Sequence, residues 1–182
     1  MAGIADVRSA ALEIVGPICK HKACSFSEAQ VGRILHAYLI GEHAGVRPEC
    51  PVMIGKSSQA IDFRFGDAPY GANPCALELA VRNSEHGPQL LASQNASELK
   101  KLSRYPESKA QTRVLLLLDL GHKPIKQEKL KRGYDELDHL GAGKFQRRSV
   151  SVLYVHRNLN YRFIWRARPR AKSRQKLPKA YR

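Results

Sequence analysis

Apolar and polar positions in the first part of the chain follow a helical period. Apolar residues recur every three to four positions over residues 4–15, which predicts an amphipathic helix that Pro17 ends. Ser27 and Gln30 have the spacing of a capping box at the start of a second helix, which is expected to end near Gly45. Later in the chain, two more helices are predicted at 89–105 and 124–141.

Short apolar runs bounded by turn residues predict the strands. They are expected at residues 50–54, 61–65, 75–81, 113–120, 149–156 and 161–166. The order ααβββαβαββ predicts an α/β fold, with a single domain over residues 1–168 and a mixed central sheet flanked by helices. Residues 169–182 have almost no large apolar side chain, so we expect a basic, mobile C-terminal tail there.

The net charge of +15 is unevenly distributed. Residues 139–182 contain 13 Lys and Arg and no Asp or Glu, and the rest of the chain is nearly neutral. A cationic segment suits a polyanion, because each phosphate that it neutralises releases counterions. The composition favours nucleic acid as the partner, while a solvated tail or a tail for ribosomal RNA or anionic lipid stays open. The expected phosphate-binding residues are Arg162, Arg166, Arg168, Arg170, Lys172 and Arg174.

Aromatic residues alternate with arginines in the last two predicted strands. They are Tyr154, His156, Tyr161, Phe163 and Trp165. One face of these strands could stack bases while the other binds phosphates. Alternatively the aromatic rings fill the core and the arginines extend to solvent, which we favour for Tyr154 and Phe163.

Several classes of protein and site are disfavoured by what the sequence lacks. No apolar stretch approaches the roughly 20 residues of a membrane span, and Met1 does not begin a signal-peptide pattern. The four cysteines are widely spaced, which favours reduced thiols in the cytoplasm. Cys19-x-His21-x-x-Cys24 lacks a nearby fourth zinc ligand, and Gly55-Lys56-Ser57 lacks the upstream glycine of a phosphate-binding loop.

Two of the predicted strands each carry one carboxylate among apolar residues. Asp62 lies in Ile61–Phe65 and Glu78 in Cys75–Val81. If such strands are buried on both faces, even a neutral polar group without a partner costs about 2–7 kcal/mol. A cation held by both acids would offset this cost, and Mg²⁺ accepts one or two carboxylates together with waters and phosphates. We therefore expect Asp62 and Glu78 to form a metal site that acts on a phosphodiester, although acids at strand ends can also be satisfied by arginines or backbone N–H groups.

The order of elements from Ser27 to Leu120 resembles the PD-(D/E)xK nuclease superfamily. The residues that carry this resemblance are Ile61-Asp62-Phe63, Leu77-Glu78-Leu79 and a following helix that ends in Arg104-Tyr105. The resemblance implies a restriction-endonuclease-like fold in which Asp62 and Glu78 bind Mg²⁺ or Mn²⁺. It also implies that Glu28 is an additional metal ligand and that Gln94 is the glutamine of the following helix. For Glu28 alone we favour a structural role, because the helix dipole stabilises an acid in the first turn of a helix.

The chain departs from the family pattern at one position. Ala80 stands where the family has the lysine that positions the attacking water or stabilises developing negative charge. Arg82 lies on the same strand face, and Lys100 and Lys101 lie on the next helix within reach. Arg82 and Lys100 are therefore included in the expected catalytic set; an arginine there could stabilise charge but could not act as a base.

The resemblance, joined to the basic C-terminal segment, predicts a metal-dependent nuclease that binds DNA rather than RNA. A homodimer stays open, because many members of the superfamily dimerise. The first alternative is an inactive protein of the same fold that serves as a nucleic-acid-binding or assembly module. The second is an unrelated basic RNA-binding protein in which both acids are structural.

Overall fold

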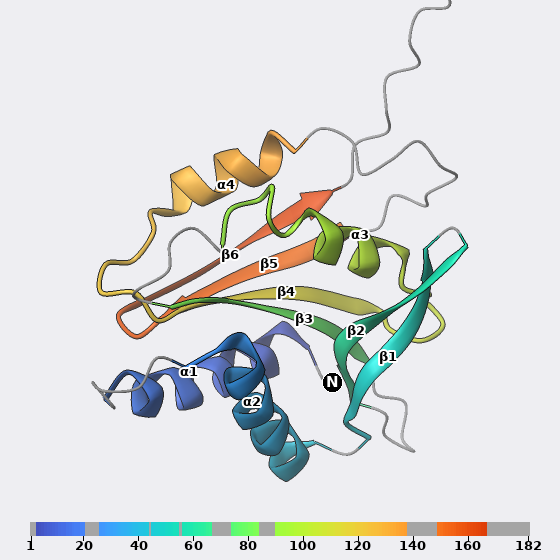
Figure 1. Ribbon diagram of the computed structural model, residues 1–182, viewed down its shortest axis with the longest axis horizontal. Coiled ribbons are helices and arrows are strands. Elements are labelled where there is room, and N and C mark those ends of the chain that lie inside the picture. The colour runs from blue at the N-terminus through green and yellow to red at the C-terminus, as the bar shows by residue number, and fades with distance from the viewer. Residues whose placement is uncertain are drawn as a thin grey trace, which may run out of the picture.

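In the computed structural model, a twisted six-stranded sheet separates two pairs of helices (Figure 1). The structure describes residues 3–20, 26–43, 45–54, 56–66, 74–83, 90–137 and 149–166. Helices α1 and α2 cover one face of the sheet, and α3 and α4 cover the other. The helices are α1 (Ile4–Lys20), α2 (Glu28–Glu42), α3 (Ala96–Arg104) and α4 (Gln127–Asp135). The strands are β1 (Arg47–Ile54), β2 (Ser57–Phe65), β3 (Cys75–Arg82), β4 (Thr112–Asp119), β5 (Ser149–His156) and β6 (Leu159–Arg166).

The strands lie in the sheet in the order in which they occur in the chain. β1, β2 and β3 are antiparallel neighbours, β3, β4 and β5 run parallel, and β6 returns antiparallel to β5. The parallel connections carry helices α3 and α4, as crossover connections between parallel strands usually do. The predicted α/β class, mixed sheet and order of elements are confirmed.

Two apolar cores form, one on each face of the sheet. Alternate residues of the strands pack under α1 and α2, and the intervening ones pack under α3 and α4. Both faces of β3 and β4 are therefore buried, as their continuous apolar runs predicted. For β2 this prediction is wrong, because exposure alternates over its second half and Asp62 is only half-buried. The cost of burying a carboxylate thus concerns Glu78, which is 1% exposed.

The predicted helix boundaries at Pro17 and residue 89 are also wrong, and α4 covers Gln127–Asp135 rather than 124–141. Helix α1 continues through Pro17 to Lys20, because Ile18 is buried in the core beyond it and the missing N–H breaks one hydrogen bond close to the helix end. Helix α3 begins at Ala96 rather than near residue 89. Asn95 precedes it in a turn, and its side chain donates to the carbonyl of Leu91 and the hydroxyl of Tyr134.

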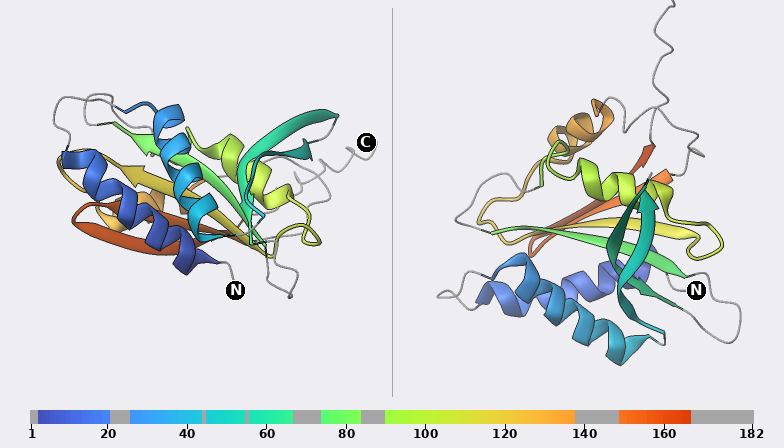
Figure 2. Two further views of the ribbon diagram at one scale, coloured as in Figure 1. Left: turned by 90° about the horizontal axis from the view of Figure 1, so that it is seen from below. Right: turned by 45° about the vertical axis from the view of Figure 1, so that its right-hand side comes forward.

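The β1–β2 hairpin curves away from the rest of the sheet toward α3 (Figure 2). Cys50, Val52 and Ile61 of the hairpin accordingly join the core under α3. With this curvature, β2 and β3 stop pairing beyond Phe63 and Leu77, and Asp62 and Glu78 are the next residue of each strand.

The described residues contain no helix long and apolar enough to cross a membrane. The expected tail at 169–182 lies outside the described residues. The same is true of Arg168, Arg170, Lys172, Arg174, His21 and Cys24.

Candidate functional site

The site begins where β2 separates from β3. The two strands pair at only three positions, the last of which joins Phe63 to Leu77. Beyond that pair, the N–H of Leu79 donates to Asp62 Oδ2 over 2.7 Å and the N–H of Val81 donates to Glu28 Oε2 over 3.2 Å. Two carboxylates therefore replace strand pairing along the exposed edge of β3.

Helix α2 positions Glu28 through its own N-terminus. Ser27 caps the helix in a full capping box with Gln30, which confirms the pattern seen in the sequence. Glu28 is the first residue of the helix, so the partial positive charge of the N-terminus also favours an acid there. The capping box and the helix dipole both stabilise the start of α2. The hydrogen bond that Glu28 accepts from the N–H of Val81 directs its carboxylate toward β3.

Glu78 lies one residue before Leu79 on β3, on the face that packs under α3. Lys101 of α3 extends to it, and Lys101 Nζ lies 2.8 Å from Glu78 Oε1. The same ammonium group donates to the carbonyl of Ala60 over 3.0 Å, where β2 no longer pairs with β3. Ala80 stands where the family pattern has a lysine. Lys101 therefore supplies a positive charge near Glu78 that Ala80 cannot supply.

The electrostatics of the site are dominated by burial. Burial, and after it the negative charge of Asp62, raise the pKa of Glu78 to about 9 against the opposing effect of Lys101. Burial lowers the pKa of Lys101, but the nearby charges of Glu78, Glu98 and Asp62 outweigh this effect and raise it. The pKa of Glu28 is raised by partial desolvation and by the charges of Asp62 and Glu98. The site therefore groups the acidic side chains of Glu78, Asp62 and Glu98 around the half-buried Lys101.

Asp62 and Glu78 together fit the coordination habits of Mg²⁺ or Mn²⁺. Glu78 Oε1 is fully buried and, among the described residues, has an ion-pair contact but no aligned hydrogen bond. The described part of the chain does not bring three His, Cys, Asp or Glu side chains together as a metal-binding group. Mg²⁺ commonly takes one or two carboxylates together with waters and substrate phosphates, so both side chains are of the right chemical kind for this ion. Glu28, the expected third ligand, accepts the N–H of Val81 on β3 through Oε2.

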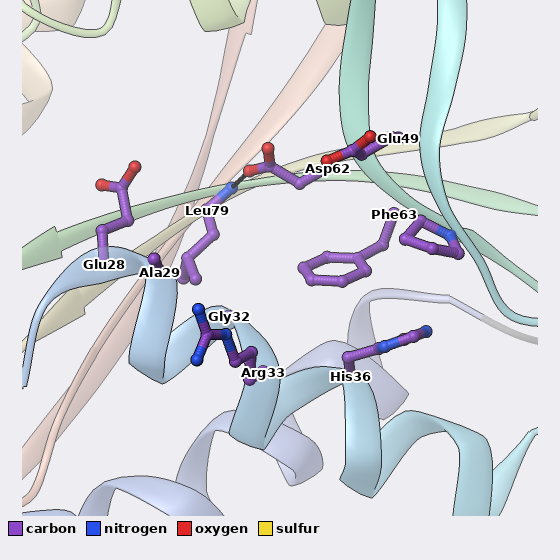
Figure 3. A pocket seen from close by; sticks show the side chains of 10 residues that line it. Glu28, Ala29, Gly32, Arg33, His36, Glu49, Asp62, Phe63 and Leu79 are labelled. Atoms are coloured by element: carbon purple, nitrogen blue, oxygen red, sulfur yellow. Dashed lines mark hydrogen bonds between the residues drawn. The ribbon is translucent and has the colours of Figure 1, made fainter.

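A cleft of about 430 Å³ opens beside Asp62, between α2 and the β1–β2 hairpin. Figure 3 shows the carboxylates of Glu28, Asp62 and Glu49 along its upper side, with Arg33 and His36 below them on α2. Glu49 faces Asp62 across the hairpin, because Pro48 pairs with Phe63 and Cys50 with Ile61. Its φ of 49° is rare for a residue other than glycine.

Arg82, one of the expected catalytic cations, is engaged elsewhere. Its guanidinium binds both carboxylate oxygens of Asp119 over 2.6 Å and donates to the carbonyl of Lys123. Four residues along a strand separate it from Glu78 by about 13 Å. Tyr154 also donates to Asp119, so this buried acid at the end of β4 has structural partners.

Lys100 and Gln94 are placed less favourably than Lys101. Lys101, rather than its neighbour Lys100 in the expected set, forms the ion pair with Glu78. Gln94 is exposed in the turn before α3 and not on the helix itself. A helix shows different faces at successive positions, and the sequence does not reveal which of two adjacent lysines faces the sheet.

The aromatic residues of β5 and β6 fill the core. Tyr154, His156, Phe163 and Trp165 are at most 6% exposed, so their rings are not available to stack bases. Arg162 and Arg166 are exposed on β6, together with Ile164 between them. Of the expected phosphate-binding residues, these two are described, and both are open to solvent.

The chain was compared with known protein families, with curated proteins and with solved structures, and no match was found in any of the three. Functional assignment therefore depends on the geometry of this site.

Proposed function

We propose that this protein is a metal-dependent nuclease that hydrolyses phosphodiester bonds in DNA. The observation that carries the proposal is the contact of 2.8 Å between Lys101 Nζ and Glu78 Oε1, one residue from the backbone N–H that Asp62 binds. It places two carboxylates and one ammonium group at a single point of the sheet. The restriction-endonuclease-like fold suggested by the order of elements is part of the same proposal.

Asp62 and Glu78 would hold the metal ion, and Lys101 would act on the phosphate. A bound Mg²⁺ or Mn²⁺ supplies a water of lowered pKa and offsets charge on the scissile phosphate. The hydrogen bond from Leu79 fixes the orientation of the Asp62 carboxylate. Lys101 is held by the carbonyl of Ala60, from where its positive charge can stabilise the negative charge that develops on the phosphate oxygens.

The exposed arginines of β6 support nucleic acid as the substrate. Arg162 and Arg166 lie on one strand, four residues apart. Two residues along a strand rise about 6.6 Å, so these side chains leave the strand about 13 Å apart and can reach different phosphates. They can contact the backbone without reading its sequence.

The test is cleavage of single-stranded, duplex and branched DNA by the purified protein with Mg²⁺, Mn²⁺ or EDTA. The wild type is compared with Asp62→Asn, in which the amide oxygen still accepts the N–H of Leu79 while one negative charge is removed. We expect metal-dependent cutting in the wild type and none in the variant. Equal cutting by both proteins would exclude Asp62 from the chemistry.

A second function is favoured by another observation. Asp62 and Glu28 both satisfy backbone N–H groups of β3, and Lys101 already neutralises Glu78. The same geometry would therefore suit a protein that binds nucleic acid without cleaving it. Titration with Mn²⁺ separates the two functions, because a purely structural site should bind the ion no more tightly than Asp62→Asn does.

A further inference from the structure

The cleft beside Asp62 has one wall that the nuclease chemistry does not use. Ala29, Gly32, Arg33 and His36 lie at helical spacing on the same side of α2 and line this wall. The floor is apolar and includes Phe63 and Leu79. The cleft therefore has an apolar floor, a cationic wall and, on the opposite side, the carboxylates of Asp62 and Glu49.

Gly32 keeps the cleft deep. A methyl group at this position would lie 3.9 Å from Leu79 Cδ2 and 4.0 Å from Phe63 Cζ, so an alanine fits without a clash. Glycine in a helix interior costs about 1 kcal/mol relative to alanine. Steric need therefore does not explain the glycine, and its effect is to leave space between α2 and the sheet.

The cationic wall suits a phosphate. Arg33 is exposed on the cleft side of α2, and the ring of His36 stacks on Phe63 with centroids 5.7 Å apart. Glu49 and Asp62 repel a phosphate from the rim opposite α2 wherever no metal ion neutralises them. A phosphate in this cleft is thereby directed toward α2, and the rest of its nucleotide toward the apolar floor.

We propose that this cleft binds one unpaired nucleotide next to the scissile phosphate, with its own phosphate at Arg33 and His36. The inference rests on the proposed function and deepens it by naming the substrate class. A volume of about 430 Å³ lies in the lower part of the range of small-ligand sites, about 300–1,000 Å³. It accommodates a nucleotide but not a duplex, so the preferred substrates have a single-stranded segment at the point of cleavage.

The first test measures binding without relying on cleavage. Fluorescence anisotropy compares a single-stranded oligonucleotide with a fully paired hairpin of the same length in Ca²⁺, which neutralises the carboxylates, and again in EDTA. Arg33→Gln should weaken single-strand binding in Ca²⁺ about tenfold, the effect of removing one charge-assisted hydrogen bond, and leave hairpin binding nearly unchanged. Arg132→Gln is the matched control, because Arg132 is exposed on α4 away from the cleft.

A second pair of variants tests the space itself. Gly32→Leu should fill the cleft and reduce single-strand binding, whereas Gly41→Leu on the same helix should not, because nothing lies within 4 Å of a Cβ atom added there and Gly41 does not line the cleft. If Gly32→Leu fails to fold, the comparison of Arg33→Gln with Arg132→Gln is sufficient to test whether the cleft binds the single strand. Equal losses for single strand and hairpin, or no loss for either, would overturn the proposal. Arg33-dependent single-strand binding in a protein that never cleaves DNA would instead overturn the nuclease and leave the cleft assignment standing.

Discussion

Lys101 of α3 and Glu78 of β3 form an ion pair of 2.8 Å across the interface between helix and sheet. The two residues are 23 positions apart in the chain, and only the packing of α3 against β3 brings them together. Lys101 is 13% exposed and Glu78 is 1% exposed, so their interaction is screened far less by solvent than a surface pair. Through this pair, Lys101 places a positive charge beside Glu78, whereas Ala80, at the position of the family's lysine, carries no charge.

Lys101→Met should reduce cleavage about 100-fold, the effect of removing one group that stabilises transition-state charge. Lys100→Met is the matched control on the adjacent position of α3 and should retain the wild-type rate. Single-turnover cleavage of labelled DNA measures both, with circular dichroism to verify folding. Equal rates for the two variants would show that Lys101 is structural.

Glu78→Gln should remove a pH dependence of stability. The raised folded pKa, about 9 against 4.5 for an ordinary glutamate, means that the folded state holds this proton more tightly than the unfolded state. Stability contributed by this group is therefore full below about pH 4.5 and falls as the pH rises toward 9, by at most about 1.4 kcal/mol per pH unit. Urea unfolding from pH 5 to pH 9 without divalent ions should show a shallower decline for the variant. Parallel curves would contradict the raised pKa of Glu78.

Metal binding should strengthen as the pH rises. Glu78 must release its proton to bind a cation, so the apparent affinity for Mn²⁺ should increase by up to about tenfold per pH unit below its pKa. Calorimetric titrations in buffers of different ionisation enthalpy would detect the released proton. A proton count of zero would place the metal ion away from Glu78.

Arg82→Ala should destabilise the protein without a specific effect on chemistry. It leaves Asp119 buried without its cation, and removal of one partner of a buried pair costs about 3–5 kcal/mol. Gly121→Ala should act in the same direction, because a methyl group there would lie 2.5 Å from Arg82 Nη2. Urea midpoints should fall for both variants, while cleavage per folded molecule at low temperature stays at the wild-type rate. A cleavage defect in fully folded Arg82→Ala would return Arg82 to the catalytic set.

Arg162→Gln with Arg166→Gln should weaken DNA binding in a salt-dependent way. For duplex DNA, the slope of log K against log salt should become shallower by about 0.9 for each phosphate that the variant no longer binds. Deletion of residues 169–182 tests the tail in the same assay. An unchanged slope in either protein would remove that segment from the interface.

Local patterns in the sequence were sufficient to predict much of the fold. The ten elements occur in the predicted order, and the capping box at Ser27 has the predicted partner in Gln30. These features depend on hydrophobic period and on contacts within one turn, which neighbouring residues determine. The predicted helix end at Pro17 was wrong because burial of Ile18 outweighed the helix-breaking proline. The predicted start near residue 89 was wrong because the turn held by Asn95 precedes α3.

The sequence by itself therefore determined the order of the elements and the presence of Asp62 and Glu78 on neighbouring strands. Only the tertiary structure decided that β2 leaves β3 after Phe63, that Asp62 then binds the N–H of Leu79, and that Lys101 faces Glu78. The reason is physical. Hydrophobic period shows which face of an element is buried, but strand twist and the rotation of a helix about its axis arise from packing between distant segments.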